Sequence, residues 1–219
     1  VFVANYSVMS SNHRQHLHAM IEYLPQFQPD IIIFYGGYNE TLQNAVQDPR
    51  PGYPYNYYYR AQTSPLKKLL IENSAIIGTI ENRTGRITGL NKIKENQKPL
   101  SRDWNARIVL KYFETLMLAN NAAGTIESKR FGKSRFFAFY QPYKVPECFT
   151  RAHNNIRNNI RTLKYAFDVS SEFDDYGEDI YSHNDDVHVT QIGNEMMGAK
   201  IAKIVAEQLH LQKAPAEKQ

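Results

Sequence analysis

A short run of β-branched and aromatic residues limits the folds that are open to this chain. Residues 30–35 (DIIIFY) stand between Pro29 and the pair Gly36-Gly37, and apolar side chains occupy consecutive positions. A strand of this kind is buried on both faces, which is typical of a parallel sheet covered by helices. Residues 1–6 form a second short apolar run, and we predict a strand there as well.

The segment between these two runs has the pattern of a helix. Asn12 is a suitable N-cap residue, and apolar residues recur at helical spacing from Leu17 to Leu24, where Pro25 ends the pattern. A strand, a helix and a strand over this length predict a right-handed parallel crossover.

Strands and helices alternate along the rest of the chain. We predict strands at residues 135–140 and 166–169, and helices at residues 66–77, from Ser101 to 123, at 153–165 and from Thr190 to 209. Residues 1–211 then form one three-layer α/β domain with a mainly parallel sheet, and residues 212–219 form a frayed tail. In such sheets the chemistry follows the carboxyl ends of the strands.

Composition excludes several classes of protein. Cys148 is the single cysteine of the 219 residues, so an intrachain disulfide and a Cys-based zinc cluster are excluded. The formal net charge of +4 does not suggest a nucleic-acid partner. No run approaches the ~18 apolar residues of a membrane helix. His13, His16 and His18 lie close together, but solvated helix histidines are more common than a metal site in such a pattern, and we predict no metal.

A loop rich in proline and tyrosine interrupts the alternation. Residues 48–60 (DPRPGYPYNYYYR) contain five tyrosines. Their rings can form the wall of a substrate site, or they can pack on one another in an ordered loop. Residues 81–99 are polar and weakly patterned, which indicates a surface excursion.

Two polar motifs follow predicted strands or precede a predicted helix. After residues 30–35, Asn39 presents an amide that can donate to a developing oxyanion, although an Asn after Gly is also a common turn residue. Before the last helix, Asp185 stands three residues ahead of His188, where a carboxylate can orient an imidazole that acts as a general base. The alternative is that Asp185 or Asp186 stabilises the helix N-terminus.

Together, these motifs resemble blocks of the SGNH hydrolases, the GDSL-like esterases. Gly37-Tyr38-Asn39 matches the family's Gly-x-Asn block, and residues 185–188 match its Asp-x-x-His block. Residues 5–10 match part of the family's second block, an Asn followed a few residues later by a Gly ahead of a helix, with Ser10 where the family usually has Gly. The resemblance implies a flavodoxin-like α/β fold and acyl transfer without a metal or organic cofactor.

The resemblance also implies roles for individual residues. His188 would be the general base and Asp185 its orienting partner. The Asn39 side chain and the Ser10 backbone N–H would donate to the oxyanion, and Gly37 and Tyr38 would lie at the substrate. The implied substrate is a small-molecule or carbohydrate ester, and the first to try is an O-acetyl group on a sugar.

The block that carries the family's nucleophile, Gly-Asp-Ser after the first strand, has no match in this sequence. We therefore expect the serine on a companion N-terminal polypeptide or on a segment outside this sequence, and a sheet without its first strand. Ser10 and Ser11 are the alternative nucleophiles. A non-catalytic binding module and an acyltransferase are the alternative functions. Because many members of the family are exported or attached to the cell envelope, the resemblance favours such a location.

Overall fold

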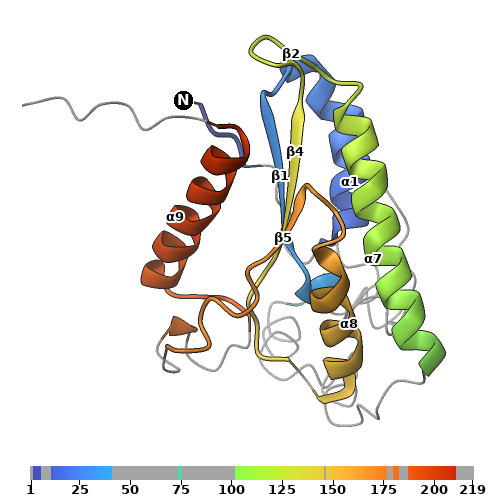
Figure 1. Ribbon diagram of the computed structural model, residues 1–219, viewed down its shortest axis with the longest axis vertical. Coiled ribbons are helices and arrows are strands. Elements are labelled where there is room, and N and C mark those ends of the chain that lie inside the picture. Colours follow the sequence, from blue (N-terminus) through green and yellow to red (C-terminus); the bar gives the residue numbers. More distant parts are fainter. Residues whose placement is uncertain are drawn as a thin grey trace, which may run out of the picture.

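The computed structural model describes residues 2–5, 11–40, 74, 102–145, 147–176, 180–182 and 187–210. Its elements are α1 His13–Tyr23, η1 Leu24–Phe27, β1 Ile31–Gly36, α7 Arg102–Ala123, β2 Glu127–Ser128, β3 Gly132–Lys133, β4 Arg135–Tyr140, η2 Glu147–Phe149, α8 Thr150–Ile160, β5 Ala166–Asp168 and α9 Gln191–Gln208. A sheet of β1, β4 and β5 lies between α9 on one face and α1, α7 and α8 on the other (Figure 1). The predicted mixed α/β class with parallel strands is confirmed.

The central strand of the described sheet is β4, which pairs with β1 on one side and β5 on the other. Both pairs are parallel, with Gly36 opposite Tyr140 and Tyr140 opposite Asp168. Parallel neighbours need a crossover connection, and α8 supplies the one from β4 to β5. The carboxyl ends of the three strands therefore meet at one end of the sheet, the lower one in Figure 1, which we call the carboxyl edge.

Alternate side chains of β4 build a separate apolar cluster on each face of the sheet. Phe136 and Tyr140 pack in the cluster that includes residues of α1, α7 and α8. Phe137 and Phe139 pack in the cluster that includes residues of α9. Because side chains alternate along a strand, a run that is apolar at every position needs a covered surface on both faces.

Helix ends follow local signals in part. The side chain of Asn12 accepts a bond from the backbone N–H of Gln15, and the Gln15 side chain accepts one from the N–H of Asn12, so a capping box starts α1. Thr190 stands at the N-cap of α9 as predicted, but its hydroxyl donates to the Ile180 carbonyl 3.2 Å away. The helix predicted at residues 153–165 covers Thr150–Ile160 instead, because the following N–H groups make tight turn bonds such as Leu163 to Ile160.

The strand predicted at residues 1–6 is wrong for the part that is described. Residues 2–5 have no strand hydrogen bonds, and Phe2 and Val3 are 92% and 84% exposed. A strand forms only beside a partner, and none of the described strands pairs with this segment. The predictions at residues 48–60, 66–77, 81–99 and 212–219 concern segments outside the described residues, Ser74 apart.

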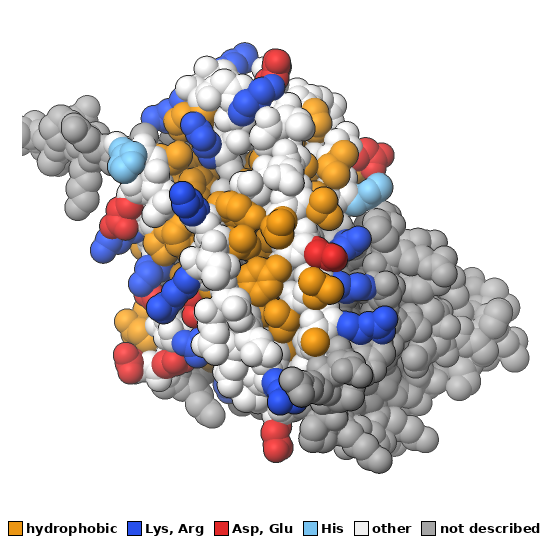
Figure 2. All heavy atoms as spheres, turned by 45° about the vertical axis from the view of Figure 1, so that its right-hand side comes forward, with side chains coloured by type: hydrophobic (Ala, Val, Ile, Leu, Met, Phe, Trp, Pro, Cys, Tyr) orange, Lys and Arg blue, Asp and Glu red, His pale blue; other side chains and the backbone are white. Residues whose placement is uncertain are grey.

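The surface of α7 carries apolar side chains. Leu110, Met117 and Leu118 are exposed on this helix, and Figure 2 shows apolar side chains gathered on this side of the molecule. Within the described ranges, no helix combines the length and the apolar character that crossing a membrane would require.

Candidate functional site

Two glycines turn the chain sharply at the carboxyl end of β1. A β-carbon on Gly36 would come within 2.7 Å of the His13 ring, and one on Gly37 within 2.4 Å of the Tyr140 ring. Gly37 also has φ of +145°, which disfavours other residues. Glycine is therefore required at both positions by close packing, and the residues that follow are held at the edge of the sheet.

The side chain of Asn39 is anchored on the segment that leads into α1. Its Nδ2 donates to the backbone carbonyl oxygen of Ser11, 2.9 Å away. An amide nitrogen carries two N–H groups, and this bond uses one of them. The half-buried Asn39 amide thus has a fixed orientation just beyond the end of β1.

Glu40, the next residue, is buried and lies against the start of α1. One carboxylate oxygen, Oε1, accepts a bond from the backbone N–H of His13 at 2.5 Å and lies 3.5 Å from the ring nitrogen Nδ1 of His13. Burial raises the pKa of Glu40, and bonds from backbone N–H groups, with that of His13 first, oppose this rise. Burial also lowers the pKa of His13 to about 3.

A serine and a histidine make a short hydrogen bond beside this turn. The hydroxyl oxygen of Ser11 lies 2.6 Å from Nε2 of His16. Burial, helped by His13, lowers the pKa of His16 to about 4, so its ring is neutral at pH 7. The Ser11 residue is only 6% exposed, which limits the access of a substrate to its hydroxyl.

Acidification is expected to destabilise the protein through these two histidines. Their pKa values lie below the unfolded value of 6.5, so the stabilisation is complete above pH 6.5 and is lost as the pH falls towards 4 and 3. Between pH 7 and 5, His13 alone accounts for about 2 kcal/mol of the free energy of unfolding. The raised pKa of Glu40 acts in the opposite sense. Urea titrations at pH 7 and pH 5 measure this effect. The free energy of unfolding should fall less between these two pH values in His13→Gln than in the parent. An equal fall in both proteins would contradict the assignment.

His188 lies directly before α9, in a segment that pairs with an earlier one. Tyr181 and Val189 form an antiparallel bridge, and the carbonyl of His188 accepts a bond from the N–H of Ser182 at 2.8 Å. Gly193 in the first turn of α9 packs so closely on Val189 that a β-carbon would lie 2.8 Å from it. The backbone of His188 is therefore held in place, and its side chain is exposed.

The segment of His188 and the end of β1 lie at the same edge of the sheet. Tyr35 of β1 and Asn194 in the first turn of α9 line one groove, and the Asn194 side chain donates to the carbonyl of Val189. Tyr181 is the bridge partner of Val189, the residue after His188. Asn39 and His188 thus follow elements that come together at the carboxyl edge. Asp185, its competitor Asp186 and Ser10 are outside the described residues.

Aromatic side chains support the turn from the side of β4. Tyr38 packs its ring edge-on against Tyr143, 5.4 Å away between centroids. The hydroxyl of Tyr143 lies 2.7 Å from that of Tyr140, which lies 2.9 Å from Nδ1 of His153. Sequence patterns did not reveal this buried network, since its members are drawn together from β4 and α8.

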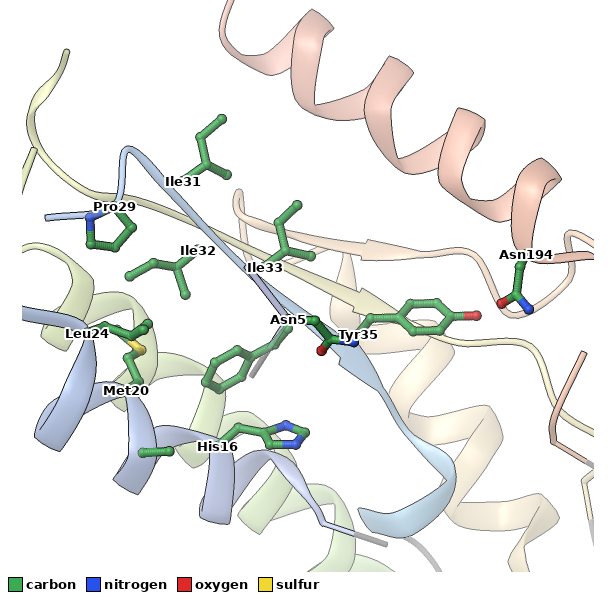
Figure 3. Close-up of a pocket in the computed structure, with 12 residues that line it drawn as sticks. Asn5, His16, Met20, Leu24, Pro29, Ile31, Ile32, Ile33, Tyr35 and Asn194 are labelled. Carbon is green, nitrogen blue, oxygen red and sulfur yellow. The ribbon is translucent and has the colours of Figure 1, made fainter. Parts of the chain in front are cut away.

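A groove of about 520 Å³ runs along the outer edge of β1 (Figure 3). Its floor is residues 31–35, His16 and Met20 of α1 line one side, and Asn194 of α9 and Asn5 also line it. Ile33 and Tyr35 are 44% and 38% exposed, although their run has the pattern of a strand buried on both faces. The helices on the two faces therefore extend past the edge strand.

The three neighbouring histidines have different surroundings. His13 is buried against Glu40, His16 bonds Ser11, and the exposed His18 lies 3.3 Å from Glu22 on the same helix. In the ranges that the structure describes, no group of three or more His, Cys, Asp or Glu side chains could hold a metal ion.

Comparisons with protein-family models, with curated proteins and with solved structures find no match to this chain. The likeness to the SGNH hydrolases therefore depends on the motif residues themselves. Of these, Gly37, Tyr38, Asn39 and His188 can be placed in the fold.

Proposed function

We propose that this chain belongs to a serine esterase of the SGNH type. The observation that carries the proposal is the Asn39 amide, whose Nδ2 lies 2.9 Å from the Ser11 carbonyl oxygen just beyond β1, near the segment of His188 and Val189 that Asn194 contacts. An oriented amide donor and an accessible imidazole at one sheet edge supply two of the groups that acyl transfer needs. The serine nucleophile is the third.

Each group has a defined part in the proposed reaction. The serine oxygen attacks the ester carbonyl carbon while His188 takes the hydroxyl proton, and Asp185 orients the imidazole. The tetrahedral oxyanion accepts bonds from the Asn39 side chain and the Ser10 backbone N–H. Collapse of the intermediate expels the alcohol, which receives the proton from His188. Water then attacks the acyl-serine by the same route and releases the acid.

The nucleophile is proposed to lie on a segment outside these 219 residues. The chain has no Gly-Asp-Ser, and the apolar strand β1 has an open groove where a neighbouring strand would be paired. A strand added in parallel there would end at the same sheet edge as β1, close to Asn39. It would also cover Ile33 and Tyr35.

Ser11 is a second candidate for the nucleophile because of one specific contact. Its hydroxyl lies 2.6 Å from a neutral imidazole nitrogen of His16, within the distance expected for a nucleophile and its base. Two features argue against it. Its residue is buried, and a base with a pKa of about 4 is weak at neutral pH.

A fluorophosphonate probe tests the proposal on the protein as its source makes it. We expect covalent labelling, and peptide mass spectrometry should find the phosphonyl group on a serine outside the 219 residues. Labelling of Ser11 would instead establish the second candidate. An absence of both labelling and hydrolysis of p-nitrophenyl acetate would contradict the esterase and favour a non-catalytic binding module on the same fold.

The same site would serve an acyltransferase if an alcohol replaced water in the second half of the reaction. Product analysis with an added alcohol separates the two activities. For the acyl donor, an acetylated sugar is the substrate class that we propose first.

A further inference from the structure

We propose that Glu40 is a positioning residue that holds the start of α1 against the turn after β1 and thereby fixes the Asn39 amide. The proposal rests on the proposed function, because it assumes that Asn39 is an oxyanion donor. Glu40 itself is buried among protein groups and is assigned no contact with substrate.

Two adjacent residues of the turn bind the two residues that flank the N-cap of α1. Asn39 donates from its side chain to the Ser11 carbonyl, and Glu40 accepts from the backbone N–H of His13. The partners are 28 and 27 residues apart in sequence, so neither bond follows from local helix geometry. Without the Glu40 bond, the bond that orients Asn39 would have to carry the contact between the two segments that both bonds now share.

Burial raises the pKa of Glu40, and the groups around its carboxylate offset part of this cost of ionisation. Its carboxylate meets the first backbone N–H of α1, where the helix dipole and the unpaired N–H groups favour a negative charge. Backbone groups of Gly37 and of Glu40 itself also stabilise the ionised form. The carboxylate therefore interacts both with the backbone of its own turn and with the start of α1.

The His13 ring is closely packed beside Glu40. The His13 ring lies between Glu40 and Gly36, and it packs on Phe34 of β1 and Tyr112 of α7 at centroid distances of 5.2 and 5.7 Å. If Glu40 were removed, the His13 N–H would lose its acceptor, and the start of α1 with the preceding Ser11 would be free to shift. A shift of Ser11 moves the acceptor that orients Asn39.

The test compares Glu40→Ala and Glu40→Gln in the complete protein, with p-nitrophenyl acetate as substrate. Misplacement of a catalytic group by about 1 Å can lower the rate about 10²-fold, so Glu40→Ala should lower kcat by about that factor with little change in KM. Glu40→Gln keeps an oxygen for the His13 N–H and should recover most of the lost kcat. The side-chain ¹⁵N–¹H signals of Asn39 should shift in Glu40→Ala and return towards the parent positions in Glu40→Gln.

Leu17→Ala is the matched control for lost stability, since Leu17 is a buried apolar residue of α1, one helical turn beyond His13. It should leave kcat and the Asn39 signals unchanged. Unshifted Asn39 signals in a folded Glu40→Ala would overturn the positioning role, and so would equal kcat values in Glu40→Ala and Glu40→Gln. If Glu40→Ala does not fold, Glu40→Gln still tests the proposal. Its Asn39 signals should match those of the parent, and shifted signals would overturn the positioning role. Shifted signals without any esterase activity in the parent would refute the proposed function and leave the positioning role intact.

Discussion

Replacement of His188 by alanine is expected to lower esterase turnover by about 10⁴-fold or more. Without the imidazole, the serine hydroxyl keeps its proton and is a weak nucleophile. The variant should fold like the parent, because the exposed His188 side chain contributes little to the core, while its backbone bond from Ser182 does not depend on the side chain. Initial rates with p-nitrophenyl acetate and the rate of fluorophosphonate labelling both measure this effect.

His18→Ala is the matched control for this experiment. His18 is also an exposed histidine, and its Nε2 lies 3.3 Å from the Glu22 carboxylate on the surface of α1. Its loss should leave turnover unchanged. Parent-like labelling of His188→Ala would show that another base serves the nucleophile, and His16 with Ser11 would then be the first pair to examine.

Local patterns predicted β1, β4, β5 and the start of α1 well because their causes are local. The alternation of side chains along β4 places apolar residues in both clusters, so the run of residues 135–140 is apolar throughout. The capping box of Asn12 and Gln15 lies within four residues. Each of these signals can be read without knowledge of the rest of the fold.

Features that depend on distant partners were not predictable in this way. The hairpin of β2 and β3 has strands of two residues each, too short for any periodicity. The apolar residues 2–5 predicted a strand, but a strand needs a neighbour, and the local sequence does not say whether one is present.

The candidate site shows the same division. The motifs identified Asn39 and His188, and the parallel topology explains why Asn39 lies at the end of the sheet where the carboxyl ends of the strands meet. The burial of Glu40 against His13 was missed, since the bond joins residues 27 positions apart. An acidic residue three positions after a Gly-Gly turn, with no nearby basic partner in sequence, was the signal available for it.

Replacement of Asn39 is expected to lower kcat by about 10²- to 10³-fold with little change in KM, the usual effect of losing one oxyanion donor. Asn39→Asp is the sharper variant, because a carboxylate oxygen replaces Nδ2 and would repel both the Ser11 carbonyl and the oxyanion. Asn159→Ala is the control: its Nδ2 also donates to a backbone carbonyl, that of Asn155 at 2.8 Å, but on the exposed surface of α8. Stopped-flow or steady-state rates separate kcat from KM. A rise in KM alone would mean that Asn39 binds the ground state and transition state equally, and the oxyanion role would then be refuted.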